Sequence, residues 1–127
     1  MHEIQTLGFY HARDVINNSI KCLFIAFKKS LKLAKEFNTL LIMDFTYKTN
    51  KYNMPMLHIL GVDNCNKSFT VALCFIRAEN EVNYSWALQE LKTALDGATP
   101  KVCVTDKEQA LMNVSSIDFY FFQIWSL

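Results

Sequence analysis

The chain has 127 residues, 51% of them apolar, and its 13 basic and 12 acidic residues leave a net charge of +1. The length fits one small domain, and the apolar content excludes intrinsic disorder. A net charge this close to zero excludes nucleic-acid binding that depends on a high overall positive charge. Any contact with nucleic acid therefore needs a local basic patch.

Targeting signals and patterned cysteines are missing from the sequence. No apolar run approaches the ~20 residues of a membrane span, and Met1 is not followed by the apolar stretch of a signal peptide. The cysteines are widely spaced and form no Cys-x-x-Cys pair, so neither a disulfide framework nor a zinc site is indicated. We therefore expect an intracellular protein, without a membrane segment, whose mostly buried thiols are reduced: Cys22, Cys65, Cys74 and Cys103.

The N-terminal third gives an ambiguous pattern. Residues 1–15 show no firm periodicity, and the apolar residues from Ile16 to Ala34 recur at three- and four-residue steps, which suits an amphipathic helix. The compact run Ile20–Phe27 is equally compatible with a strand, followed by a short helix capped by Ser30. We predict a helix over residues 30–37 and leave 16–27 open between helix and strand.

Next come three segments with strand character. Residues 40–47 (LLIMDFTY) form an apolar run broken by one acid, which predicts a strand buried on both faces. Residues 54–62 and 68–76 flank a polar cluster that begins with Asp63, and this spacing predicts a hairpin. Asp63 is expected to make an Asx-type hydrogen bond within the turn.

The remaining pattern alternates helix and strand. Apolar residues from Tyr84 to Leu95 recur with helical period, and Gly97 is the expected C′ residue of this helix. Residues 101–105 (KVCVT) predict a short strand, and a second helix is expected over 106–113. An N-terminal helical lead-in is followed by elements in the order β-β-β-α-β-α. This order predicts an α/β domain (α+β, with a mixed sheet) in which helices cover the sheet.

Two acids stand out as candidate metal ligands. Asp44 interrupts an apolar strand, where a carboxylate needs a cation or a hydrogen-bond donor; the alternative is a solvated or Lys48-paired Asp near the strand end. Asp106 with Gln109 forms a capping box, a role compatible with metal binding. Two carboxylates at the ends of neighbouring strands could hold a pair of divalent ions for phosphodiester chemistry.

Other candidates have plainer interpretations. His58 is interpreted as a hydrogen-bonded core histidine and not as a ligand. The polar residues Tyr47, Lys48, Thr49 and Asn50 follow Asp44 and would border its site. A set of lysines spreads around one helix, which favours a solvated face over contacts with a DNA backbone: Lys28, Lys29, Lys32 and Lys35.

The segment Leu41–Gly61 (LIMDFTYKTNKYNMPMLHILG) resembles the signature of MULE (Mutator-like element) transposase domains. In these domains an Asp precedes a Thr-Tyr-Lys-Thr-Asn run, a Pro and a second strand that ends in Gly. The resemblance extends through YSWAL at residues 84–88 and VTDKEQALMN at 104–113. We therefore predict a poorly patterned lead-in over 1–22, a partial MULE domain over 23–113 and a divergent tail over 114–127.

The resemblance implies an RNase H-like fold and the acid triad of cut-and-paste DNA transposases, used with Mg²⁺ or Mn²⁺. Asp44 corresponds to the first acid and Asp106 to the second, whereas the third has no counterpart here, so we expect an incomplete fold and an inactive, C-terminally truncated fragment. DNA at transposon ends is the implied partner, and the nucleus is the implied location.

The tail and the history of the family leave an alternative open. Residues 114–127 (VSSIDFYFFQIWSL) depart from the family's Cys-x-Trp-His motif, and this aromatic segment is expected to pack on the sheet or to mediate self-association. The far-red-response transcription factors of plants resemble the same transposase family. A non-catalytic relic, or a domesticated module for interaction or transcription regulation, is therefore the alternative to a transposase fragment.

Overall fold

The computed structural model describes residues 2–4, 8–37, 40–46, 54–78, 80–98, 100–105 and 124–126, of which 2–4, 45–46 and 124–126 are described by their backbone alone. Across these residues no helix combines the length and the apolar character that a membrane crossing requires.

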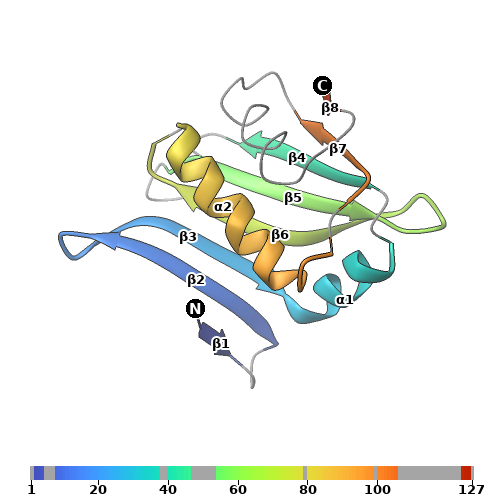
Figure 1. The fold of residues 1–127 in the computed structure, drawn as a ribbon, viewed down its shortest axis with the longest axis horizontal. Helices are drawn as coiled ribbons and strands as arrows, with labels where there is room; N and C mark the ends of the chain where they lie inside the picture. Colours follow the sequence, from blue (N-terminus) through green and yellow to red (C-terminus); the bar gives the residue numbers. More distant parts are fainter. Residues whose placement is uncertain are drawn as a thin grey trace.

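One mixed sheet organises the described residues (Figure 1). Its strands follow the order β1-β2-β3-β6-β5-β4-β7-β8. The pairs β4–β7 and β7–β8 are parallel, and the other neighbours are antiparallel. The strands are β1 (His2–Ile4), β2 (Phe9–Ile16), β3 (Ser19–Phe27), β4 (Leu40–Thr46), β5 (Met56–Val62), β6 (Ser68–Ile76), β7 (Val102–Thr105) and β8 (Ile124–Ser126).

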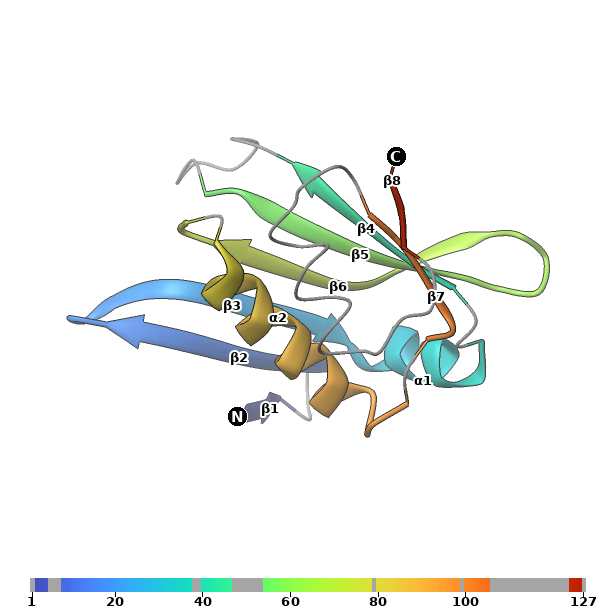
Figure 2. The same cartoon turned by 45° about the horizontal axis from the view of Figure 1, so that its top comes forward.

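Two helices accompany the sheet, α1 (Lys28–Glu36) and α2 (Glu81–Ala94). Helix α2 crosses one face over β3 and β6, and α1 lies near the C-terminal end of α2 (Figure 2). The chain passes from β6 through α2 to β7, which pairs with β4. The predicted order β-β-β-α-β is therefore confirmed, as is the mixed α+β class, whereas the helix predicted over 106–113 lies outside the described residues.

The N-terminal segment is a hairpin and not a long helix. Strands β2 and β3 pair antiparallel across a two-residue turn, in which Asn17 and Asn18 have φ of 52° and 62°. Positive φ at both central residues is the pattern of a type I′ turn, which matches the twist of the strands. The helical lead-in is thus confined to α1, and Ser30, the predicted cap, lies inside that helix. The domain limits at residues 22 and 113 stay predictions.

Every second strand residue contributes to a core between the sheet and α2. Side chains with this alternation are buried, including Tyr10, Ala12, Cys22, Phe24, Ala26, Leu41, Met43, Leu57, Ile59 and Cys103. Helix α2 contributes Tyr84, Ala87, Leu88 and Leu91 at helical spacing. The pattern shows that this face of the sheet, which we call the α2 face, holds the hydrophobic core.

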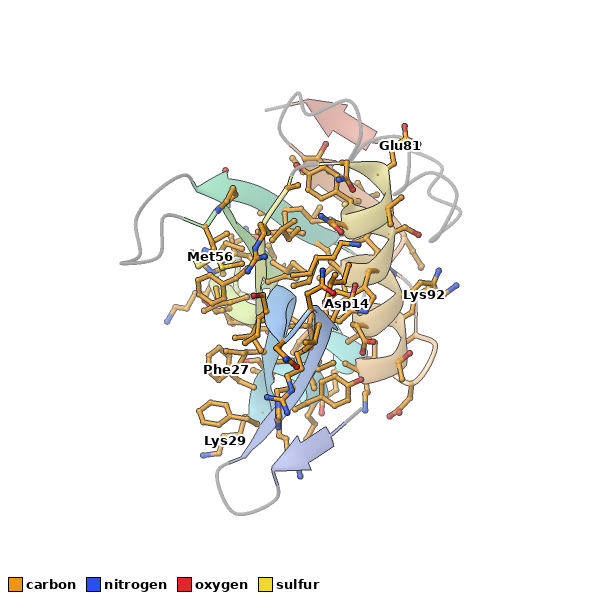
Figure 3. The ribbon with its side chains drawn as sticks, turned by 90° about the vertical axis from the view of Figure 1, so that its left-hand side faces the viewer. Asp14, Phe27, Lys29, Met56, Glu81 and Lys92 are labelled. Atoms are coloured by element: carbon orange, nitrogen blue, oxygen red, sulfur yellow. The ribbon has the colours of Figure 1, made fainter. Side chains whose placement is uncertain are left out.

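The opposite face of the sheet carries half-exposed apolar side chains, and neither described helix covers it. Residues of this open face include Leu23, Ile25, Phe27, Ile42, Met56, Leu60, Leu73 and Phe75. Figure 3 shows Phe27 and Met56 on the side of the sheet away from α2. The prediction that residues 40–47 form a strand buried on both faces is therefore wrong for the part described, because α1 and α2 both leave this face open.

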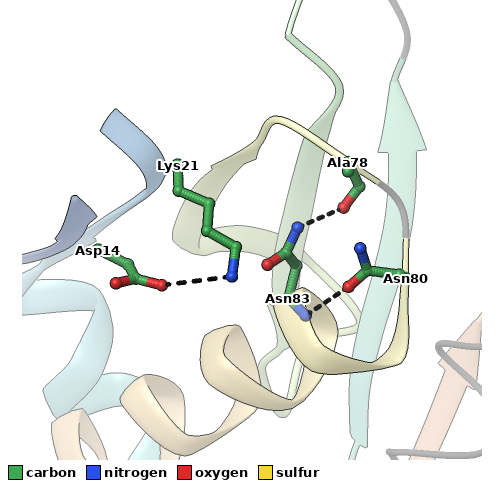
Figure 4. Close-up of polar contacts among 5 residues, drawn as sticks. All are labelled: Asp14, Lys21, Ala78, Asn80 and Asn83. Carbon is green, nitrogen blue, oxygen red and sulfur yellow. Dashed lines mark hydrogen bonds and ion pairs between the residues drawn. The ribbon is translucent and has the colours of Figure 1, made fainter. Parts of the chain in front are cut away.

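The two ends of α2 are fixed by polar contacts. Asn80 caps its start by accepting a hydrogen bond from the Asn83 backbone N–H (2.9 Å), and the buried Asn83 Nδ2 donates to the Ala78 carbonyl (2.7 Å; Figure 4). At the other end, Gly97 N–H donates to the Lys92 carbonyl and Asp96 N–H to that of Thr93. These two bonds form a Schellman motif in which Asp96 (φ 54°), and not the predicted Gly97, occupies C′.

Candidate functional site

Asp44 lies on the open face near the C-terminal end of β4, and its side chain is exposed. Its neighbours along the strand, Met43 and Leu41, point to the opposite side and are buried in the core. The alternative of a solvated Asp near the strand end agrees with this position, because alternation along β4 directs Asp44 away from α2. An exposed carboxylate keeps its water shell, so it carries no desolvation penalty and stays accessible to a cation from solution.

His58 is the cross-strand neighbour of Asp44. The two residues are register partners in the antiparallel pair β4–β5, which places their side chains on the same face. The half-buried imidazole makes a 2.8 Å hydrogen bond between His58 Nε2 and Thr70 Oγ1. The hydrogen bond expected of His58 is confirmed, but the residue is half-buried on the open face and not in the core. Its position beside Asp44 depends on the register of the two strands.

A β-bulge makes the His58–Thr70 contact possible. The register between β5 and β6 shifts after Ile59, which pairs with Ala72, whereas the next residue, Leu60, pairs with Thr70. The extra residue, Val71, turns inward, so that Val71 and Ala72 are both fully buried. Beyond the bulge Thr70 returns to the side of His58. A local bulge beside polar residues is a common device for aiming a side chain at a site.

The parallel pair β4–β7 determines where the second predicted acid enters. Met43 pairs with Thr105, and Thr105 is fully buried on the α2 face. Asp106 follows Thr105 directly in the sequence, as Asp44 follows Met43. Asp106 itself lies outside the described residues, and so do the site-bordering residues Tyr47, Lys48, Thr49 and Asn50. Their assignment to the site stays a prediction.

The other acids and the metal-ligating residues do not gather in the part of the chain that the structure describes. No group of three or more His, Cys, Asp or Glu residues could hold a metal ion within those ranges. Asp63 serves the β5–β6 turn, since its Oδ1 accepts from the backbone N–H groups of Cys65 (2.8 Å) and Lys67 (2.9 Å). The predicted Asx-type bond is confirmed, and Asp63 is already committed to the turn.

The cysteines are free, and three of them are buried. Burial raises the pKa of Cys22 to about 11, with the nearby Asp14 carboxylate adding to the rise, and it raises the pKa of Cys103 to about 12. Burial also raises the pKa of Cys74, well above the ordinary thiol value. These thiols are protonated at neutral pH, so they are poor nucleophiles and poor metal ligands. Cys65 alone is exposed, on the β5–β6 turn.

A basic pocket lies elsewhere, between α1 and the C-terminal end of α2. It has a volume of about 450 Å³ and is lined by Tyr10, Lys28, Leu31, Lys32, Lys35, Thr93, Ala94 and Asp96. Lys35 Nζ contacts the Asp96 carboxylate across it, and the Tyr10 hydroxyl donates to Glu90 (3.1 Å). Three of the four lysines noted in the sequence therefore share one concave surface and do not spread around the helix.

Comparisons with known proteins place the chain among transposase-related sequences. Residues 40–123 match the MULE transposase domain family. The FAR1-related sequence 12 protein of Arabidopsis thaliana is 22% identical over an alignment 131 residues long, gaps included, which covers 98% of this chain and 17% of that protein. The FAR-RED IMPAIRED RESPONSE 1 protein of the same plant is 26% identical over 109 residues, 85% of this chain and 13% of its own. The chain thus spans less than a fifth of the length of these relatives.

A solved structure also resembles the chain at a low level. It is a simian T-cell lymphotropic virus intasome in complex with PP2A regulatory subunit B56 gamma. The match has a TM-score of 0.41 and 16% sequence identity, and it covers 72% of this chain and 34% of the other.

Proposed function

This chain belongs to the MULE transposase domain family, and on that basis we propose that Asp44 and Asp106 hold a divalent cation, Mg²⁺ or Mn²⁺, for phosphodiester chemistry on DNA. The proposed site is the two-acid part of a transposase-type catalytic centre. The proposed partner is DNA at transposon ends, and the proposed location is the nucleus. Tyr47, Lys48, Thr49 and Asn50 would border the cation.

The parallel pairing of β4 with β7 is the observation that carries the proposal. Each acid directly follows one member of the pair Met43–Thr105 in the sequence. Two carboxylates that extend from adjacent parallel strands can approach the same ion, and hard oxygen ligands are those that Mg²⁺ and Mn²⁺ prefer. The exposed Asp44 carboxylate fits this donor set, because its oxygens are open to solvent.

Affinity and activity follow from the number of ligands. Two carboxylates supply at most about four oxygens, whereas Mg²⁺ takes six ligands and keeps water in the remaining positions. When bound, the cation would polarise a phosphodiester oxygen and acidify the attacking water. Asp44 and Asp106 would orient this cation, and with only these two acids we expect weak binding and no strand cleavage by the chain alone.

Titration with Mn²⁺ followed by NMR tests the site. Paramagnetic broadening of backbone amide signals should be strongest at Asp44 and at Thr105, and the apparent affinity should fall at least tenfold in Asp44→Asn and in Asp106→Asn. A tenfold loss corresponds to about 1.4 kcal/mol. Asp14→Asn on β2 is the matched control, since it removes the same charge from a half-exposed aspartate several strands away.

One outcome would contradict the proposed metal site, and another would contradict the expected inactivity. Equal broadening in Asp44→Asn and in the unsubstituted chain would remove Asp44 from the site. Robust Mn²⁺-dependent nicking of supercoiled DNA by the purified chain, abolished in Asp44→Asn, would keep the site but refute the expected inactivity.

A non-catalytic interaction or regulatory module is the second candidate. It is favoured by the similarity to the FAR-RED IMPAIRED RESPONSE 1 protein, whose name refers to a response to far-red light. A chain of this kind would retain the fold while the carboxylates no longer bind metal. Absence of any Asp44-dependent Mn²⁺ signal, together with retained folding by circular dichroism, would favour this candidate over the first.

A further inference from the structure

The pocket between α1 and α2 has one wall that is uniformly basic. Lys28, Lys32 and Lys35 occupy positions i, i+4 and i+7 of α1, a spacing that places them on one side of a helix. The adjoining Leu31 is buried beneath them. Since α1 rises about 1.5 Å per residue, the ammonium groups are distributed along about 10 Å of the helix.

The opposite wall neutralises only part of this charge. Among the lining residues the last turn and C-cap region of α2 supply Thr93, Ala94 and a single acid, Asp96, which contacts Lys35. Glu90 adds a second negative charge beside the pocket, since its carboxylate accepts the hydrogen bond of the Tyr10 hydroxyl and stays anionic. The lining residues carry three positive charges against one negative charge, and with Glu90 counted the pocket keeps an excess of one positive charge.

We infer that this pocket, which we call the α1 pocket, binds the phosphate groups of a nucleic-acid backbone. Lysine is a mobile point charge without the fork of arginine, so it suits sequence-independent contacts with phosphates. Neighbouring phosphates of one strand lie further apart than the rise of about 3.4 Å per nucleotide along the helix axis, so the lysine row can contact about two of them. The apolar stretch at Leu31 and Ala94 lets the lysine stems pack while their ammonium groups stay in solvent.

The α1 pocket is separate from the proposed metal site. The chain leaves α1 and enters β4 at Leu40, whereas Asp44 lies further along the strand and on the open face. The inference rests on the proposed function only in taking DNA as the source of the phosphates. A chain that fails to bind Mn²⁺ through Asp44 could still bind DNA through the α1 pocket, so the two experiments fail independently.

Fluorescence anisotropy with a labelled 20-base-pair duplex of mixed sequence tests the inference, over a range of salt concentrations. Each lost phosphate contact reduces the slope of log K against log[salt] by about 0.9. The double variant Lys28→Gln/Lys32→Gln should therefore lower the slope by about 2 and weaken binding about tenfold or more at low salt. The matched control is Lys29→Gln/Lys67→Gln, which removes the same charge from exposed lysines outside the pocket and should change the slope by less than about 0.5.

Three results would overturn the inference. Equal losses in the pocket variant and in the control would assign binding to general surface charge. Binding of the duplex with no change in slope in the pocket variant would place the DNA elsewhere. Inorganic phosphate or ATP that shifts the α1 amide signals in NMR, while the duplex leaves them unchanged, would assign the pocket to a free phosphate compound. Circular dichroism and urea midpoints of both variants establish that each is folded.

Discussion

Gly61 occupies a position on β5 where any side chain would collide with a neighbouring ring. It pairs with Phe69 on β6, and a Cβ atom built on Gly61 would lie 2.5 Å from Phe69 Cζ and 2.9 Å from Cε2. Ordinary van der Waals contact begins at 3.4 Å. The glycine is therefore required for space, and the aromatic ring of Phe69 covers the gap that the missing side chain leaves.

Two opposing effects decide the stability of Gly61→Ala. Replacing a strand glycine by alanine lowers the entropy of the unfolded chain and stabilises by about 0.5–1 kcal/mol. Forcing a methyl group against a packed ring costs about 1–3 kcal/mol. Because Phe69 packs against the core and must move by nearly 1 Å, we expect the collision to dominate, with a net loss of about 1–2 kcal/mol.

Urea unfolding of a double-mutant cycle measures this balance. In the Phe69→Ala background the collision is gone, so Gly61→Ala should be neutral or should stabilise by up to about 1 kcal/mol. The sign of the effect therefore changes between the two backgrounds. An equal loss in both would refute the reasoning, because it would show that the alanine acts through the backbone and not through the ring.

Two further predictions concern the start of α2 and the buried thiols. Asn80→Ala removes the hydrogen-bond acceptor of the Asn83 N–H and should lower the free energy of unfolding, measured by urea titration, by about 1 kcal/mol. Asn80→Asp keeps an acceptor and should retain most of this stability. Equal losses in the two variants would contradict the capping role. Burial raises the pKa of Cys22 from 9.0 to about 11 and that of Cys103 from 9.0 to about 12. Because these thiols ionise more readily in the unfolded chain, the free energy of unfolding is unaffected below pH 9 and decreases as the pH rises toward the folded-state pKa values. The urea concentration at the unfolding midpoint should therefore decrease as the pH is raised from 8.5 to 10.5. This decrease should be smaller in Cys22→Ala than in the unsubstituted chain. An equal decrease in both would show that Cys22 is not a cause.

The sequence predicts the central part of the fold better than the N-terminal part. Residues 54–62 and 68–76 flank a turn that contains Asp63, and their strand character agrees with the hairpin β5–β6. The segment from Ile16 to Ala34 misleads because its apolar residues fit both helical and strand periods. The turn at Asn17 and Asn18 gives a weaker signal than an Asn-Gly pair. Pairing with β2 on one side and with β6 on the other decides in favour of the strand β3.

The surroundings of Asp44 depended on information that periodicity does not contain. An apolar run such as LLIMDFTY predicts burial on both faces only if both faces are covered, and α1 and α2 leave the face of Asp44 open. The sequence pattern does not indicate that His58 lies beside Asp44, since this proximity depends on the register of β4 with β5. The β-bulge opposite Ile59 and Leu60 brings Thr70 to the side of His58. No glycine or other clear sequence signal marks this bulge.

The order in which the strands neighbour one another has a kinetic consequence. The hairpins β2–β3 and β5–β6 join segments that are adjacent in sequence, so each can form within microseconds. The pairs β3–β6 and β4–β7 join residues from distant parts of the chain, and closing such loops costs entropy before any contact repays it. We therefore expect slow folding, in milliseconds to seconds, limited by the docking of preformed hairpins. The alignment of β7 beside Asp44 would then be among the last events of folding.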